Sequence, residues 1–176
     1  MYRRLAIVAS AAVLLTVRAN AMEVTSTEMS SGGTLSLEQV HIKCGGQNVS
    51  PPLLWNGAPT AAKSYAVTVF DPDAHGDGWW HWIAFDIPAN VHSLPKGASA
   101  DAMPSGSVQG ENDFGDKLYG GACPPPGSGQ HHYEFTVWAF DTPTIPFDSS
   151  ATGEKIKSYL EGHAIARAKI VPVLQR

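Results

Sequence analysis

Residues 64–88 read SYAVTVFDPDAHGDGWWHWIAFDIP, and this stretch decides the fold class. Its first part, 64–73, is rich in β-branched and aromatic residues and ends in turn formers, which predicts a strand. Its last part, 79–88, is almost continuously apolar, which predicts a second strand buried on both faces. Pro72 has no N–H to give to a sheet ladder, so the first strand must end near it or lie at an edge.

The chain on either side of this stretch extends the β pattern. HHYEFTVWAF (131–140) predicts a third strong strand, and GGTLSLEQV (32–40) predicts a weaker one that opens the domain. Three segments rich in Pro, Gly or Ser are expected to be irregular, at 44–59, 95–110 and 119–130. Thirteen Pro and seventeen Gly in 176 residues indicate many turns, as in a mainly β domain.

A helix is expected near the C-terminus, within 153–171. Residues that suit a buried helix face recur there at helical spacing, at Ile156, Tyr159, Leu160 and His163. Thr152 is a candidate N-cap for this helix. We interpret His163 as a core or helix-end histidine rather than as a ligand.

The first 21 residues predict a secretory signal peptide. Arginines near the start are followed by an apolar run over 5–17, and Ala19-Asn20-Ala21 supplies the A-x-A cleavage site. An uncleaved anchor is the alternative, but the apolar run is short for a bilayer. We expect cleavage after Ala21 and export of a single domain, 22–176, that begins with a polar arm over 22–33.

The charge of the exported chain argues against nucleic acid as a partner. Cleavage removes three arginines and no acids, which leaves 9 basic against 16 acidic residues and a net charge of −7. A mildly acidic protein without a basic patch binds nucleic acid poorly. Any anion that it binds must therefore be held by local groups.

The chain contains two cysteines, Cys44 and Cys123. In an exported protein such a pair is most simply a disulfide, with two free thiols as the alternative. The bond would close a loop of about 80 residues and contribute roughly 4 kcal/mol on the chain-entropy model. No C-x-x-C motif is present, which argues against a redox enzyme.

Polar residues fall on apolar faces near one end of each strong strand. Because side chains alternate along a strand, each polar group can be assigned apolar neighbours on its own face. These neighbours are Tyr65, Val67 and Val69 for the aspartates, Ile83, Phe85 and Ile87 for His81, and Phe135 and Val137 for the third strand. The polar residues expected to converge on one pocket, beside 119–129, are Asp71, Asp73, His81, His131 and Tyr133. Taken singly, each also suits a turn or a core position.

Together these motifs resemble the phosphatidylethanolamine-binding proteins, also called the Raf kinase inhibitor protein family, and in particular their bacterial exported branch. The resemblance covers the chain from about Gly32 to the C-terminus. It rests on NVSPPLLWNGAP (48–59), DPDA (71–74), GWWHW (78–82), IPANVHSLPKGAS (87–99), YGGACPPPG (119–127) and HHY (131–133). The family pattern differs at His75, where Pro is usual, at His132, where Arg is usual, and in the final VPVLQR, which lacks the usual Gly and Tyr.

The resemblance implies two antiparallel β-sheets packed as a sandwich, with short helices and a small anion pocket near one end. It also implies a periplasmic or secreted protein. The ligand-binding residues that it assigns are the acidic pair Asp71 and Asp73, the histidines His81 and His131, Tyr133, and Cys123 and Pro124 of the lining loop.

We expect this pocket to bind phosphate or a phosphate-bearing head group without catalysis and without a cofactor. The imidazoles and Tyr133 would donate, with added N–H groups from Ala122 and Cys123. Asp71 and Asp73 are expected to accept from the imidazoles and raise their pKa. The alternative is that they accept from an ethanolamine-like ammonium or from backbone N–H groups. Phosphate affinity should then weaken as the pH rises through the histidine pKa values.

Other functions remain open from the sequence. Two His and two Asp are possible zinc ligands, but their spacing does not resemble a closed zinc site, and no metal is expected. A Ser-His-Asp hydrolase would need a serine elbow, and G-x-S-x-G does not occur; Gly127-Ser128-Gly129 lies in a Pro-rich loop. The family resemblance also suggests that the chain is an exported serine-protease inhibitor that acts by surface contact. A cytosolic kinase is an unsuitable target for an exported chain. The tryptophans Trp79, Trp80 and Trp82 belong either to the core or to a contact surface that could serve a homodimer.

Overall fold

The structure is a computed structural model that describes residues 21–176. The predicted signal peptide therefore lies outside the described residues, apart from Ala21. In chain order the elements are β1 (Glu23–Thr25), η1 (Ile42–Cys44), β2 (Leu53–Asn56), β3 (Ser64–Asp71), β4 (Trp79–Pro88), β5 (Ser93–Leu94), α1 (Ala98–Asp101), β6 (Val108–Gln109), β7 (Gln130–His132), β8 (Glu134–Phe140), α2 (Gly153–His163), β9 (Ala166–Ile170) and β10 (Val173–Gln175). The expected mainly β class is confirmed.

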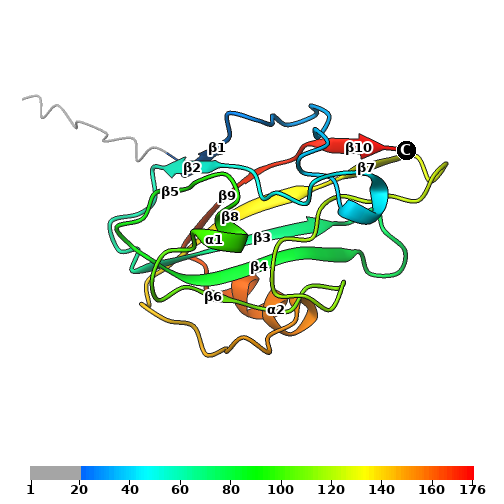
Figure 1. Ribbon diagram of the computed structural model, residues 1–176. Coiled ribbons are helices and arrows are strands. Elements are labelled where there is room, and N and C mark those ends of the chain that lie inside the picture. The colour runs from blue at the N-terminus through cyan, green and yellow to red at the C-terminus, as the bar shows by residue number, and fades with distance from the viewer. Residues whose placement is uncertain (1–20) are drawn as a thin grey trace, which may run out of the picture.

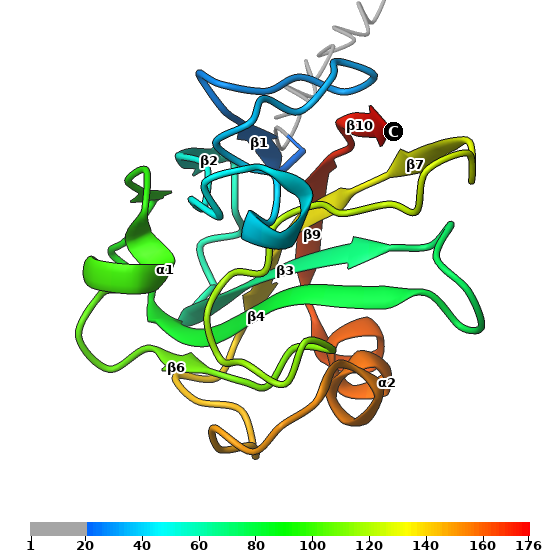
Figure 2. The ribbon, with the colours of Figure 1, turned by 45° about the vertical axis from the view of Figure 1, so that its right-hand side comes forward.

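The strands form one large and two small antiparallel sheets. The large sheet has the order β6-β4-β3-β8-β9, and the small ones are β1-β2-β5 and β10-β7. Figure 1 shows the small sheets above the large one and α2 below it, and Figure 2 shows the same layers after a turn. The large sheet is therefore covered on both faces.

Alternation along the central strands supplies two hydrophobic cores. Tyr65, Val67 and Val69 of β3 pack toward the small sheets, whereas Ala66 and Phe70 pack toward α2. β4 lies between β3 and β6 and is buried over most of its length, as its continuous apolar sequence predicted. Each large side chain buried in these cores contributes about 1.5–3 kcal/mol relative to exposure.

A β-bulge interrupts the pairing of β3 with β4. Val69 pairs with Trp82 and Phe70 with Trp80, so His81 is an extra residue opposite the partner strand. The expected grouping of His81 with Ile83 and Phe85 is wrong, because those two residues pack in the core under α2. A bulge puts consecutive residues out of strict alternation and re-aims one side chain. It lets His81 turn to the opposite side of the sheet.

The N-terminal part of the domain differs from the sequence prediction. Residues 32–40 form turns and isolated bridges rather than a strand, with Thr34 bridged to Val173 and Val40 to Ala122. The strand that opens the domain is β1, in the segment expected to be a polar arm. Its middle residue, Val24, pairs with Trp55 of β2 and packs against the core, which stabilises so short a strand.

The predicted C-terminal helix is α2. Ile156 and Leu160 are fully buried, and Thr152 occupies the N-cap position, although its side chain makes no capping hydrogen bond. His163 lies at the exposed helix end and stacks on Tyr159, with ring centroids 4.0 Å apart. Within residues 21–176 no helix is long and apolar enough to cross a membrane.

Candidate functional site

A pocket of about 630 Å³ opens at one end of the large sheet. Figures 1 and 2 place the turn after β3, the turn before β7 and the C-terminus at this same end. The pocket is lined by residues within 71–75, Trp79 and His81 of β4, Phe114, residues 123–128 and His131. Residues 123–128, called here the proline loop, form one wall. Six of the eight ligand-binding residues expected from the sequence line this pocket: Asp71, Asp73, His81, Cys123, Pro124 and His131.

His131 lies between two hydrogen-bonding partners. Its Nδ1 is 2.7 Å from Asp71 Oδ2, and its Nε2 is 2.9 Å from Ser128 Oγ. The His131 and Asp71 side chains are each only 4% exposed. Asp71 therefore accepts a hydrogen bond from a pocket imidazole, as expected. The other Asp71 oxygen accepts the N–H of Asp73 at 2.9 Å, so this carboxylate also shapes the turn after β3.

His81, on the opposite wall, is held by the backbone rather than by an acid. Its Nδ1 is 2.8 Å from the carbonyl oxygen of Gly120, which can only accept, so Nδ1 carries the proton of the neutral ring. Burial lowers the pKa of His81 to about 4, although the carbonyls of Gly120 and Gly121 and the charge of Asp71 oppose the shift. The charge of Asp71 does raise this pKa, as expected, but burial outweighs its effect and the net shift is downward. At neutral pH His81 has no charge, and Nε2 is its acceptor atom.

Asp73 turns away from the pocket histidines. Its Oδ2 accepts from both the backbone N–H and the Nδ1 of His132, each at 2.8 Å. Partial burial raises the pKa of Asp73, but the hydrogen bonds from His132 outweigh this effect and leave the pKa lowered. The expectation that Asp73 serves a pocket imidazole is wrong, because its partner is the outward-facing histidine of the HHY motif.

Two of the expected ligand-binding residues lie behind the pocket wall. Tyr133 is 1% exposed and meets His81 edge-on, with ring centroids 5.2 Å apart. Its hydroxyl has no hydrogen-bond partner within residues 21–176, and burial raises its pKa. The amide of Ala122 donates to the Gln39 carbonyl at 3.0 Å, so the expectation that it donates into the pocket is wrong.

The sequence did not assign Phe114 or Ser128 to the pocket, although Ser128 was noted in the Pro-rich loop, and both line it. Phe114 packs edge-on against both Trp79 and His81, with ring centroids 5.4 and 5.5 Å apart. Nothing in the sequence around Phe114 predicts its contacts in the pocket. The position of Ser128, three residues before His131, is a signal that could have indicated its place there. Trp80 and Trp82 are core residues, and Trp79 alone of the three tryptophans reaches the pocket.

In the part of the chain that the structure describes, no group of three or more His, Cys, Asp or Glu side chains is arranged to hold a metal ion.

Comparison with known proteins identifies the family. The family described as "Phosphatidylethanolamine-binding protein" matches residues 25–175. The chain belongs to this family. The UPF0098 protein YbcL of Escherichia coli K12 is 46% identical over 169 residues, which cover 93% of this chain and 92% of YbcL. The UPF0098 protein YbhB of the same organism is 40% identical over 154 residues, covering 85% and 97%.

Two solved structures share this fold. The crystal structure of E. coli YbcL, described as a member of the mammalian PEBP family, superposes with a TM-score of 0.86 at 45% identity, covering 89% of this chain and 99% of that one. Carboxypeptidase Y inhibitor, in complex with its cognate proteinase, gives a TM-score of 0.54 at 16% identity, covering 89% and 83%. The second match shows the fold alone.

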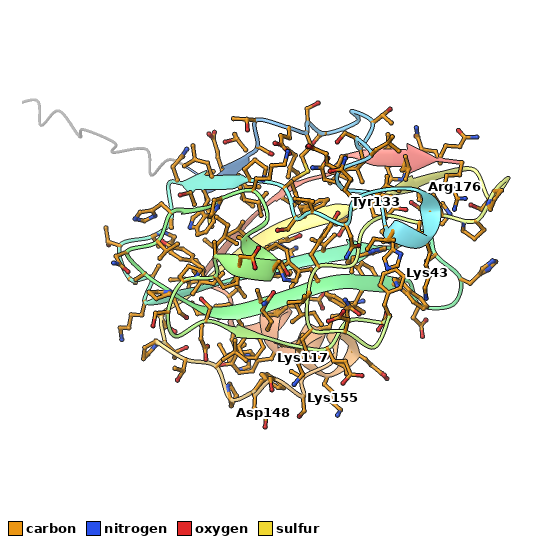
Figure 3. The ribbon with its side chains drawn as sticks, in the orientation of Figure 1. Lys43, Lys117, Tyr133, Asp148, Lys155 and Arg176 are labelled. Atoms are coloured by element: carbon orange, nitrogen blue, oxygen red, sulfur yellow. A yellow bond between two sulfur atoms is a disulfide. The ribbon has the colours of Figure 1, made fainter. Side chains whose placement is uncertain are left out.

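The C-terminus of this member of the phosphatidylethanolamine-binding protein family supports the proline loop. β10 pairs with β7, and the carbonyl of Arg176 accepts the N–H of Gly127 at 3.0 Å. The Arg176 guanidinium donates to the Pro124 carbonyl at 3.3 Å and contacts Cys44 Sγ. Figure 3 shows Arg176, Tyr133 and Lys43 of η1 at this end of the molecule.

The expected disulfide joins Cys44 to Cys123 across 79 residues of sequence. Cys44 ends η1, and Cys123 begins the proline loop. The bond therefore ties one wall of the pocket to a separate part of the chain.

Proposed function

We propose that the protein binds a small phosphate-bearing anion, such as a phosphoethanolamine-type head group, in the pocket between β4 and the proline loop. The observation that carries this proposal is the convergence of Asp71, His81 and His131, from segments far apart in the sequence, on one pocket. Membership of a family described by phosphatidylethanolamine binding supports the same ligand chemistry.

The charges around the pocket indicate which protonation form of the ligand it binds. Among the described residues that line it, none is Lys or Arg, and two are aspartates. His81 is neutral at pH 7 and offers an acceptor, so it favours a ligand that brings its own proton. We therefore assign the singly protonated phosphate monoester as the bound form, with its P–O–H donated to His81 Nε2.

Calorimetry with O-phosphoethanolamine tests this proposal. Since a phosphate monoester loses its second proton near pH 6, the affinity should fall at least about tenfold between pH 5.5 and pH 8. Inorganic sulfate, which carries no proton in this range, should bind more weakly than phosphoethanolamine at pH 5.5 and show no such fall. His81→Phe should remove the pH dependence, and His163→Ala, at the exposed helix end, should keep it.

Two results would count against this function. Equal affinity for sulfate and phosphoethanolamine at pH 5.5 would remove the role of the ligand proton. The absence of any heat and any shift in melting temperature with either anion would remove the anion site itself.

We place this binding activity outside the cytoplasm. The predicted signal peptide ends at Ala21, and the described domain begins at once with Met22, which is 8% exposed and part of the core. The Cys44–Cys123 disulfide suits an oxidising compartment. A protein partner such as a protease would meet the protein there.

A further inference from the structure

We propose that Ser128 is an activated nucleophile that takes the acyl group from small carboxylic esters entering the pocket. In this proposal His131 is the general base and Asp71 orients His131. This activity goes beyond the proposed function, which requires only that an anion binds.

The geometry of the three side chains supports this assignment. Ser128 Oγ is 2.9 Å from His131 Nε2, and His131 Nδ1 is 2.7 Å from Asp71 Oδ2. Both distances fall within about 2.6–3.2 Å, the range in which a serine, its base and the base's orienting group exchange hydrogen bonds. Each nitrogen of the imidazole faces the partner that this chemistry requires, since the carboxylate is on Nδ1 and the hydroxyl on Nε2.

The three side chains differ in exposure in a way that suits a serine nucleophile with a buried base. The Asp71 and His131 side chains are buried at 4% exposure, whereas Ser128 is exposed and lines the pocket. A carbonyl group in the pocket can therefore reach Ser128 Oγ while the base and its orienting carboxylate stay shielded from water.

The backbone around Ser128 forms a tight turn. Gly127 and Gly129, on either side of it, have φ values of 78° and 93°, which side-chain-bearing residues rarely adopt. The turn is fixed on its outer side by the N–H of Gly127, which donates to the Arg176 carbonyl. The sequence lacks G-x-S-x-G, but this turn presents its serine to a histidine three residues later on β7.

The hydroxyl of Ser128 has a second acceptor, the Pro125 carbonyl, at 2.8 Å. Because the hydroxyl has one proton, it can donate either to Pro125 or to His131 Nε2, but not to both. Only the second arrangement activates the oxygen, and it requires that Nε2 carry no proton. The reactive form is therefore neutral His131, with its proton on Nδ1 facing Asp71.

The proposed reaction has two balanced halves. Ser128 Oγ adds to the ester carbonyl carbon as its proton passes to His131 Nε2, and the bond to the alcohol then breaks as the alcohol takes that proton. The products are acyl-Ser128 and the free alcohol. Water then attacks the acyl group by the same proton route, which releases the carboxylic acid and restores Ser128.

The test uses the mature, oxidised protein and a fluorophosphonate probe, which forms an Oγ–P bond with an activated serine and loses fluoride. We expect intact-mass spectrometry to find one added phosphonyl group, and peptide mapping to place it on Ser128. Ser128→Ala should remove the label, whereas Ser105→Ala, at an exposed loop serine away from the pocket, should keep it. p-Nitrophenyl acetate should show a burst of nitrophenol that is lost with the same variant.

Three further variants separate chemistry from structure. His131→Ala should react at least about 100-fold more slowly, within the contribution usual for a general base, and added imidazole should restore part of the rate. Asp71→Asn should slow labelling, because an amide that keeps its oxygen on the Asp73 N–H turns its NH2 toward His131 Nδ1 and so places the ring proton on Nε2. Asp71→Glu should recover part of the rate.

The outcomes distinguish this inference from the proposed function. Phosphoethanolamine binding without any labelling of Ser128 overturns the nucleophile and leaves the anion site standing. Labelling of Ser128 without phosphoethanolamine binding supports the nucleophile and overturns the anion site. Equal labelling of Ser128→Ala, or of urea-unfolded protein, also overturns the inference.

Discussion

Two Asp–His pairs lie next to each other where β3 meets β7, and they differ mainly in burial. The inner pair, Asp71–His131, has its atoms 2.7 Å apart and both side chains 4% exposed. In the outer pair the corresponding atoms are 2.8 Å apart, but His132 is 48% and Asp73 39% exposed. The same chemistry at nearly the same distance therefore stands in two different dielectric environments.

This difference in burial shows why hydrogen-bond length alone does not determine how much each pair contributes to stability. Water screens the outer pair and solvates either partner if the other is lost. The inner pair has little access to such a substitute, because the Asp71 and His131 side chains are each only 4% exposed. Removal of one inner partner should therefore cost several times more than removal of one outer partner.

The largest effect is expected for His131→Ala. This change leaves the Asp71 carboxylate buried without its hydrogen-bond donor, which costs about 1–3 kcal/mol, and more for a charged group. Urea unfolding of the oxidised protein at pH 7 measures the loss. The double variant Asp71→Asn/His131→Ala is the control, and it should recover part of the stability because no unpaired charge remains. A loss below about 1 kcal/mol for His131→Ala would show that water reaches the inner pair after all.

A second prediction concerns His81, which is buried in the same pocket without a carboxylate partner. Its pKa is about 4 in the folded protein, against 6.5 for an unperturbed histidine, so the unfolded chain binds the proton more tightly. Stability from this residue is therefore complete above pH 6.5 and is lost as the pH falls toward 4, by about 3 kcal/mol in total.

The variant His81→Phe isolates that contribution. It keeps an aromatic ring against Phe114 and Tyr133 but cannot take up a proton. Unfolding free energies measured from pH 7 to pH 4 should fall less steeply for the variant than for the parent protein. Parallel curves would mean that folding does not lower the pKa of His81.

The contrast between His131 and His81 also marks how far the sequence could predict the site. Strict alternation from Tyr133 to Val137 placed the HHY strand correctly, so His131 on the inside and His132 on the outside followed from the residues alone. Alternation failed for β4, because the bulge at His81 inserts a residue and leaves no trace in an almost continuously apolar run. The pattern identified His81 as a candidate but assigned it the wrong face.

Hydrogen-bond partners were the other part that the sequence could not specify. Asp71 and Asp73 were expected to share a face, but the chain turns directly after β3, so Asp73 meets His132 instead. The Ala122 amide donates to the Gln39 carbonyl, and Arg176 contacts the proline loop. Both contacts join residues far apart in the sequence, so no local pattern specifies them. The cysteine pair was easier, since a chain with only two cysteines leaves a single intramolecular pairing.

The smallest effect is expected for His132→Ala in the outer pair. Both partners are more than a third exposed, so the lost interaction should cost about 0.2–1 kcal/mol, as for other exposed pairs. The N–H of His132 still donates to Asp73 after the change, because that bond belongs to the backbone. Urea unfolding at low salt and at 1 M salt measures the effect, and added salt should bring variant and parent closer together. A loss of stability equal to that of His131→Ala would mean that the Asp–His contact itself, rather than its burial, determines the strength of both pairs.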